Sequence, residues 1–310
     1  MRSAVVTAFG GTESLAIVER PLADPGVGEV RLRVRSAAVN PVDIVTRAGR
    51  LSAAGLHGPA PIGLGWDASG SVDAVGTGTR RIRVGQPVIG LSDRLQSLVK
   101  THADAVILPE SAVAAIPGDL DPDVAAALPL AGSTALQALD ALDLPEGASL
   151  LVTGAAGAVG SLTVQLARLR GLRVVANARA KHEARLRELG SDVFLPATDR
   201  LADDVRRLVP GGVDGAVDAA SLGIQSLDAV RNQGAHVSLV VTQRPPALRG
   251  IRSVSVAVQA NWQHLTLLAA LAATGSLQVS IAEVIPLQDV AKAHELLEVG
   301  GLTGRIILRP

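Results

Sequence analysis

From Ser149 onward the chain alternates short apolar runs with helical segments, and this alternation constrains its fold more than any other feature. Repeated strand–helix units of this kind predict a parallel sheet covered by helices. The predicted strands are SLLVTG, RVVANA, DVFLP, GAVDAA, HVSLVV and RSVSVAV. The predicted helices between them are VGSLTVQLARLRG, KHEARLRELG, LADDVRRLVPG and IQSLDAVRNQG, with Gly171, Gly190 and Gly234 as C-terminal caps.

The chain before about Pro117 has a different pattern. Short β-branched runs, several with period-two alternation, are separated by glycine and proline turns, which predicts a mostly antiparallel, barrel-like β domain. The sequence Asp-Pro-Asp at 121–123 is typical of a helix start. The tail contains a strand, an amphipathic helix and a last strand that we expect to fold back onto the β domain. We therefore expect a β domain of residues 1–121 completed by 276–310, and a parallel-sheet domain of residues 122–275.

Composition excludes several classes of protein and site. The 29 basic and 29 acidic residues balance, which argues against a partner that is nucleic acid or a membrane surface. The absence of cysteine excludes disulfides, thiolate zinc sites and a catalytic cysteine, and the chain also has no tyrosine. No apolar stretch reaches the roughly 18 residues needed to span a bilayer, and the N-terminus is too strand-like for a signal peptide. We expect a soluble cytoplasmic protein.

A cluster of small residues joins the first strand of the alternating series to its helix. Glycines recur at every third position with alanines between them, giving A-x-G-x-x-G where the common dinucleotide fingerprint has G-x-G-x-x-G. Small residues let backbone N–H groups at a helix start approach a pyrophosphate, and the last glycine lets the helix pack closely on the strand. The alternative is a purely structural turn. We interpret the segment as a dinucleotide site formed by Gly154, Ala155, Ala156, Gly157, Ala158, Val159 and Gly160.

The end of the second strand bears on which nicotinamide cofactor binds. An NAD site usually has Asp or Glu about 20 residues after the first glycine. Residues 177–181 instead read NARAK, and no carboxylate follows before Glu183. Arg179 and Lys181 would attract a 2′-phosphate, and the helix dipole disfavours two cations at a helix start unless an anion lies nearby. They could also be ordinary solvated charges. We favour NADPH.

Several blocks of sequence then occur in a specific order. They are AAVNPVD (37–43), GWDASGSVDAVG (65–76), VGQPVIG (84–90), LPLAGSTALQAL (128–139), TGAAGAVG (153–160), RELGSD (187–192) and the ending GLTGRIILRP. Together they resemble the medium-chain dehydrogenase/reductase superfamily, specifically its zinc-independent quinone oxidoreductase branch. The likeness covers nearly the whole chain.

The resemblance implies a fold and an activity. The fold is a GroES-like β domain with a Rossmann domain, a doubly wound parallel sheet, inserted before its last elements. The activity is NADPH-dependent hydride transfer to a small-molecule quinone or α,β-unsaturated carbonyl. Homodimers built through the edge strand of the Rossmann sheet, here about residues 251–259, are common in the family.

The resemblance also bears on metal binding. The zinc-dependent members use cysteine and histidine ligands, whereas this chain has no cysteine and its histidines show no ligand spacing. We therefore expect no metal ion, and without a Lewis acid nothing would stabilise the alkoxide of simple alcohol oxidation.

By resemblance, the nicotinamide lies in the cleft between the domains, near Asn40, Pro41, Asp43 and Thr134. Hydride addition builds charge on the carbonyl oxygen of the acceptor, and hydrogen-bond donors aimed at that oxygen would help. Asn40, Asp43 and Thr134 are therefore candidate catalytic residues. Asn40 could instead stabilise a turn, and Asp43 and Thr134 could instead cap helices.

Three further residues are candidates for cofactor binding. Val240 and Val241 follow the fifth strand, at the carboxyl edge of the sheet where ligands bind, and could pack on the nicotinamide. Arg305 lies where family members commonly carry Lys or Arg near the cofactor. It could also be a charge at a strand edge.

Two segments depart from the family pattern. Many relatives carry a tyrosine in the loop where this chain has Arg50 and Leu51, and residues 90–100 lack the usual Gly-x-Tyr-Ala-Glu-Tyr signature. Both segments border the expected substrate cleft. Two alternatives to a quinone or enone reductase therefore stay open: a biosynthetic tailoring enzyme that reduces a C=C bond of a polyketide-like or polycyclic substrate, and an NADPH-binding protein without redox turnover.

Overall fold

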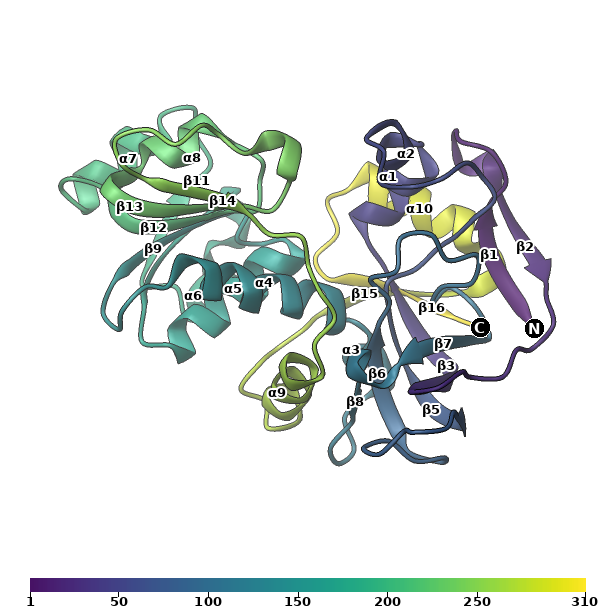
Figure 1. Ribbon diagram of the computed structural model, residues 1–310. Coiled ribbons are helices and arrows are strands. Elements are labelled where there is room, and N and C mark those ends of the chain that lie inside the picture. Colours follow the sequence, from purple (N-terminus) through teal and green to yellow (C-terminus); the bar gives the residue numbers. More distant parts are fainter. The chain divides into compact units, whose positions relative to one another are not determined.

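The computed structural model describes residues 1–310 and divides them into two units (Figure 1). The first unit comprises Met1–Leu130 and Gln259–Pro310, and the second comprises Ala131–Val258. The second unit is thus inserted in the chain before the last elements of the first, as the family resemblance implies.

A six-stranded sheet forms the centre of the second unit. Its order is β11-β10-β9-β12-β13-β14, and every neighbouring pair is parallel. The first strand lies in the middle and the sheet grows outward in both directions, which is a doubly wound arrangement. The predicted fold class is confirmed. The strands are β9 (Ser149–Thr153), β10 (Arg173–Ala178), β11 (Val193–Pro196), β12 (Val213–Asp218), β13 (Val230–Ser238) and β14 (Arg252–Ser255).

Helices cover both faces of this sheet. In Figure 1, α5 and α6 lie on one face, and α7 and α8 lie on the other. Apolar residues of strands and helices meet in one buried cluster that includes Leu151 of β9, Val175 of β10 and Val205 of α7. The helices are α4 (Pro129–Leu142), α5 (Ala158–Leu169), α6 (Glu183–Glu188), α7 (Leu201–Leu208) and α8 (Ile224–Asp228), with single 3-10 turns η3 (Ala180–His182) and η4 (Val241–Gln243).

One predicted helix is too long. The pattern placed a helix over 224–234 and a C-terminal cap at Gly234, but α8 ends at Asp228 and Gly234 lies inside β13. The chain extends there because Val230 pairs with Val213 of β12. The caps at Gly171 and Gly190 are confirmed, since their φ angles are +72° and +104°.

The first unit is built on a mostly antiparallel sheet of order β15-β16-β3-β5-β6-β8, with β7 also paired to β3. A second, three-stranded sheet has the order β2-β1-β4. The tail returns to this unit as predicted, because β16 pairs antiparallel with β3. The strands are β1 (Arg2–Val6), β2 (Leu15–Glu19), β3 (Glu29–Val39), β4 (Ile62–Gly63), β5 (Asp67–Val75), β6 (Pro87–Leu91), β7 (Ala105–Pro109), β8 (Val113–Ala115), β15 (Ile281–Pro286) and β16 (Arg305–Arg309).

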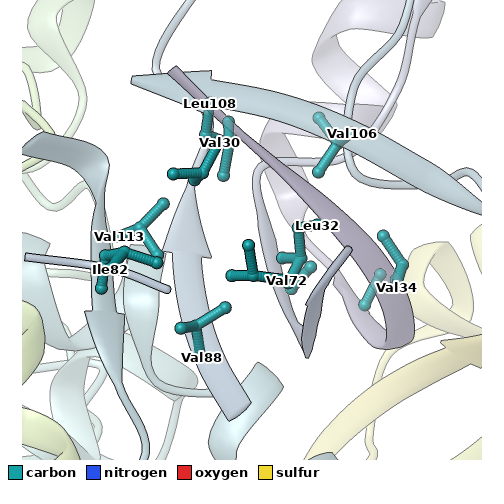
Figure 2. Close-up of a cluster of buried hydrophobic side chains, with 11 residues drawn as sticks. Val30, Leu32, Val34, Val72, Ile82, Val88, Val106, Leu108 and Val113 are labelled. Atoms are coloured by element: carbon teal, nitrogen blue, oxygen red, sulfur yellow. The ribbon is translucent and has the colours of Figure 1, made fainter. Parts of the chain in front are cut away.

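Alternating residues of these strands form the core of the first unit. Figure 2 shows Val30, Leu32 and Val34 of β3 pointing into a cluster with Val72 of β5 and Val88 of β6. The period of two in the sequence therefore places one face of each strand in the core. The helices of this unit are α1 (Pro41–Arg47), α2 (Arg50–Ala53), α3 (Pro122–Ala126), α9 (Trp262–Ala273) and α10 (Val290–Val299), with 3-10 turns η1 (Thr12–Ser14), η2 (Glu110–Ala112) and η5 (Leu287–Asp289).

The division of the chain differs from the expected boundaries at residues 122 and 275. Helices α3 and α9 fall outside the second unit. Asp121 caps α3 as predicted, accepting hydrogen bonds from the backbone N–H groups of Asp123 and Val124. The Asp123 carboxylate then accepts from Ser36 of β3 at 2.5 Å. This contact and the packing of α3 on β3 and β5 attach the helix to the first unit.

Candidate active site

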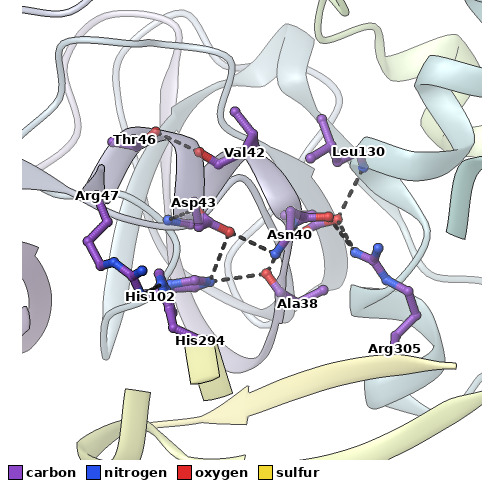
Figure 3. A network of polar contacts seen from close by, with 12 residues as sticks. Ala38, Asn40, Val42, Asp43, Thr46, Arg47, His102, Leu130, His294 and Arg305 are labelled. Atoms are coloured by element: carbon purple, nitrogen blue, oxygen red, sulfur yellow. Dashed lines mark hydrogen bonds and ion pairs between the residues drawn. The ribbon is translucent and has the colours of Figure 1, made fainter. Parts of the chain in front are cut away.

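Polar side chains gather at one end of the main sheet of the first unit. Asn40 follows β3, Asp67 begins β5 and Arg305 begins β16. Because β3 is antiparallel to both β5 and β16, its end lies beside their starts. Asn40 Nδ2 donates to Asp67 Oδ1 at 2.9 Å, and Asn40 Oδ1 accepts from Arg305 Nη2 at 2.6 Å. Figure 3 shows Asn40 and Arg305 pointing toward each other.

Burial dominates the electrostatics of this cluster. Asp67 is 0 % exposed, and burial raises its pKa to about 6, although Arg305 and the hydrogen bond from Asn40 act in the opposite direction. Burial likewise lowers the pKa of the Arg305 guanidinium. Arg305 Nη2 lies 3.6 Å from Asp67 Oδ2, and the backbone N–H of Leu130 donates to the same oxygen at 3.3 Å. The Arg305 guanidinium is thus buried against Asn40 and Asp67.

Asp43 is fully buried, and its carboxylate accepts hydrogen bonds from two backbone N–H groups. Its Oδ2 accepts from the N–H of Asn40 at 2.9 Å, and its Oδ1 accepts from the N–H of Gly65 at 2.9 Å. His102 Nε2 lies 4.0 Å from Asp43 Oδ2 and 3.0 Å from the Ala38 carbonyl oxygen (Figure 3). Proton transfer to Asp43 would weaken two backbone hydrogen bonds. The geometry favours the capping role over general acid–base chemistry.

His294 of α10 is buried in the same unit. Its Nδ1 lies 3.3 Å from Arg47 Nη1, and Arg47 Nη2 donates to Glu298 at 2.6 Å. Burial lowers the pKa of His294 to about 4. The imidazole is therefore neutral near pH 7 and packs as a helix residue, as its amphipathic pattern indicates.

The glycine turn of the second unit brings a helix start close to a strand. Gly154 has a φ of +57°, and Gly157 is the N-cap of α5. A Cβ atom at Gly160 would lie 2.3 Å from the Gly154 carbonyl oxygen, so only glycine fits there. The first N–H groups of α5 have no carbonyl one turn before them. Small residues and free donors at a helix start fit a pyrophosphate group.

A hydrogen-bond network fixes the neighbouring strand ends. Thr153 Oγ1, at the end of β9, donates to Asp218 Oδ1 at 2.7 Å and accepts from the N–H of Ala220 at 3.2 Å. The Asp218 carboxylate also accepts from the N–H groups of Leu222 and Gly223. Asp218 therefore caps the turn after β12, next to the glycine turn.

The end of β10 carries an unbalanced positive charge. Arg179 and Lys181 are exposed and form no ion pair, because the nearby Glu183 is paired with Arg187 at 2.8 Å. This charge affects the neighbouring His182. Burial lowers the pKa of His182, and the charges of Lys181 and Arg179 lower it further. This end of the strand thus attracts an anion.

The remaining predicted site residues belong to the second unit. Thr134 lies in the second turn of α4, which begins at Pro129, so it does not cap that helix. Val240 and Val241 follow β13 and are 43 % and 63 % exposed, which leaves two apolar side chains uncovered at the carboxyl edge of the sheet.

Sequence patterns missed two residues of the first unit, Asp67 and Lys100. Asp67 is a lone carboxylate in the apolar run GWDASGSV, and Lys100 is one of only three lysines and lies in the run SLVKTHADAVILP. A charged residue within a mostly apolar, β-branched run is the signal that could have found them.

The side-chain clusters and the helices also bear on metal binding and on membrane crossing. No group of three or more His, Cys, Asp or Glu side chains is arranged to hold a metal ion. None of the helices combines the length and apolar character that crossing a bilayer requires.

Known families match both parts of the chain. Residues 26–118 match the alcohol dehydrogenase GroES-like domain family, and residues 189–308 match a family described as zinc-binding dehydrogenase. The chain is 29 % identical to the chloroplastic NADPH-dependent alkenal/one oxidoreductase of Arabidopsis thaliana, over 100 % of this chain and 80 % of that protein. It is 27 % identical to a quinone oxidoreductase of Pseudomonas aeruginosa, over 98 % of each.

Solved structures share the fold over the full chain. An NAD-dependent alcohol dehydrogenase matches with a TM-score of 0.85 and 29 % identity, over 100 % of both chains. Mycobacterial Rv1454c, solved in complex with NADPH, matches with a TM-score of 0.85 and 26 % identity, also over 100 % of both chains.

Proposed function

This chain belongs to the medium-chain dehydrogenase/reductase superfamily, and from that premise we propose that it transfers a hydride from NADPH to an α,β-unsaturated carbonyl or a quinone without a metal ion. Oxidoreductases acting on such acceptors are among its relatives. The observation that carries the proposal is the glycine turn followed by a strand end with two unpaired cations.

The cofactor assignment follows from charge. NADPH differs from NADH by a 2′-phosphate, and Arg179 and Lys181 supply positive charge at the strand end where that group binds in doubly wound folds. A carboxylate at this position would repel the phosphate. The nearby carboxylate of Glu183 forms an ion pair with Arg187. The first turn of α5 would hold the pyrophosphate through its N–H groups.

The protein's part in the chemistry is to bind and orient. When bound, the nicotinamide supplies the hydride. Val240 and Val241 would pack against it as uncovered apolar side chains, and Thr134 of α4 would face the bound reactants. Asn40, Asp43 and Arg305 are proposed to act as positioning residues, since their polar atoms hold one another and the backbone.

We propose metal independence because the chain lacks the side chains that a metal site would need. The chain has no cysteine, and no cluster of three ligating side chains occurs.

We also propose a cytoplasmic homodimer. β14 is an edge strand whose outer side can pair with a second copy, and the lack of cysteine fits a reducing compartment. Light scattering of the purified protein would give the dimer mass; a monomer mass at micromolar concentration would contradict it.

The test is to follow oxidation of NADPH and NADH with a panel of enones, quinones and a large polycyclic enone, in the wild type and in Arg179→Asp. We expect the wild type to prefer NADPH. The variant should lose about tenfold to a hundredfold in kcat/KM with NADPH, because one charged contact is worth about 1.5–3 kcal/mol, and little with NADH. Arg200→Asp, at another exposed arginine of this unit, is the matched control.

Three outcomes separate the alternatives. Equal losses with both cofactors in Arg179→Asp would contradict the 2′-phosphate assignment. Turnover with the polycyclic acceptor alone would indicate a tailoring enzyme. Tight NADPH binding with no oxidation by any acceptor would indicate a binding protein.

A further inference from the structure

A histidine and a serine of the second unit form a fully buried contact. His236 of β13 and Ser226 of α8 are both 0 % exposed, and His236 Nε2 lies 2.8 Å from Ser226 Oγ. The Ser226 hydroxyl donates its one proton to the Gly223 carbonyl oxygen at 2.8 Å. His236 must therefore donate from Nε2 to Ser226, and its Nδ1 is an acceptor without a hydrogen-bond partner.

Packing alone does not explain why this contact is polar. Burial lowers the pKa of His236, and the charge of Asp218 acts in the opposite direction, so the imidazole is neutral near pH 7. Both partners lose their hydration when they are buried. Two apolar side chains of the same shape could fill the same space at no greater cost.

The contact helps to hold the loop of residues 219–223, which joins β12 to α8. The Asp218 carboxylate accepts from the N–H of Leu222 at 3.1 Å and from the N–H of Gly223 at 2.7 Å. Gly223 is thus fixed through both of its backbone polar groups, the N–H by Asp218 and the carbonyl oxygen by Ser226.

Loop 219–223 has an unfavourable backbone conformation. Ser221 has a φ of +58°, in the left-handed region that residues other than glycine rarely adopt. Such a conformation persists only where the surrounding contacts enforce it, and it is commonest at binding sites. The hydrogen bonds of Asp218 and Ser226 are the contacts that enforce it here.

The same loop lies against the glycine turn. A Cβ atom at Gly154 would be 3.0 Å from the carbonyl carbon and oxygen of Ala219. The N–H of Ala220 donates at 3.2 Å to Thr153 Oγ1, directly before that glycine. A displaced loop would therefore release the end of β9 and the turn that leads into α5.

We propose that Ser226 and His236 are positioning residues for the pyrophosphate of NADPH: they fix loop 219–223, and the loop keeps the glycine turn in the shape that presents the first N–H groups of α5. This inference rests on the proposed function and deepens it. Every residue in the argument belongs to the second unit.

Strands β9 and β12 provide a matched control at their opposite ends. Ser149 Oγ, at the start of β9, donates to Asp214 Oδ2 at 2.7 Å. Thr153 Oγ1, at the end of β9, makes the equivalent contact with Asp218 at the same distance. Ser149→Ala thus deletes a mostly buried serine hydroxyl of the same unit at the sheet edge away from the glycine turn.

The first experiment measures the Kd of 2′-phospho-ADP-ribose by calorimetry, because this probe has the pyrophosphate and the 2′-phosphate of NADPH without the nicotinamide. Ser226→Ala and His236→Met should each weaken binding at least about fivefold, the low end of coupling between distinct sites. The double variant should lose no more than either single variant, since both remove one contact. His236→Gln, which retains an N–H donor, should regain most of the affinity, and Ser149→Ala should bind as the wild type.

The outcomes separate this inference from the proposed function. Wild-type affinity in folded Ser226→Ala and His236→Met, or an equal loss in Ser149→Ala, would overturn the positioning role. A wild type that does not bind the probe would overturn the proposed cofactor site and this inference together. A wild type that binds the probe, shows the expected losses and reduces no acceptor would refute the reductase activity alone.

The second experiment needs no variant. Amide hydrogen exchange of the wild type is compared with and without saturating probe. Because only the protein with a fixed loop binds well, the probe should slow exchange at Ala220, Leu222 and Gly223 by about fivefold or more. The N–H of Asp214, which donates to Ser149 Oγ at 3.0 Å, is the internal reference and should change less. Bound probe that leaves exchange in the loop unchanged would overturn the proposal.

Discussion

At the scale of single residues, three buried polar side chains of the first unit, Asn40, Asp67 and Arg305, form one hydrogen-bonded cluster. Asn40 provides both the acceptor for Arg305 and the donor for Asp67. A buried polar group that loses its partner retains its desolvation cost, which makes such contacts costly to break.

We therefore predict that Asn40→Ala lowers the free energy of unfolding by about 2–4 kcal/mol, because the Arg305 and Asp67 atoms would both lose a partner. Asn232→Ala, at an exposed asparagine of β13, should stay within about 0.5 kcal/mol of the wild type. Urea denaturation of both variants measures the difference. Equal small effects would show that the buried contact contributes nothing.

Residue roles were only partly predictable from the sequence. Asp43 and Asn40 stood out through the Asn-Pro sequence at a strand end. Thr134 could not be placed, because the start of α4 at Pro129 is not apparent within LPLAGSTA. The burial of Lys100 arises from packing of the segments around 66 and 100, far apart in sequence, and no local pattern encodes it.

At the scale of elements, the contact between β9 and α5 depends on one missing side chain. We predict that Gly160→Ala destabilises the second unit by about 1–3 kcal/mol, since the added Cβ would lie 2.3 Å from the Gly154 carbonyl oxygen. It should also weaken NADPH binding, because α5 must shift away from the strand. Ser161→Ala changes the next position of the same turn without adding an atom. Thermal unfolding and fluorescence titration with NADPH compare the two, and a Gly160→Ala protein that matches Ser161→Ala in both would contradict the close-packing role.

The order of elements was predictable because the spacing of apolar residues and the positions of glycines at turns are local signals. All six strands of the second unit were found this way. The errors occur where tertiary pairing overrides local preference: α8 stops at Asp228 because Val230 joins β13. Likewise α3 and α9 look like the other helices in sequence, and only their packing on β3, β5 and β8 assigns them to the first unit.

At the scale of the whole molecule, we expect the buried lysine to make stability depend on alkaline pH. The pKa of Lys100 is lowered from 10.5 to about 8, so between these values the unfolded chain binds more protons than the folded one. Stability must then rise with pH over this interval, by about 3 kcal/mol in total. Neither cysteine nor tyrosine is present to titrate in the same interval.

We predict that urea denaturation of the wild type shows greater stability at pH 10 than at pH 8, and that Lys100→Met removes this rise. Lys292→Met, at an exposed lysine, should behave as the wild type. A rise that is equally large in Lys100→Met would assign it to other groups.

The central claim is direct hydride transfer from NADPH to a conjugated acceptor, and isotope transfer tests it most directly. The wild type would be supplied with NADPH carrying deuterium at the transferable C4 position and with an enone, and the product examined by NMR. We predict deuterium at the β-carbon of the saturated carbonyl and a proton from water at the α-carbon. Product without deuterium at the β-carbon, or deuterated NADPH that binds and is never oxidised, would contradict the account.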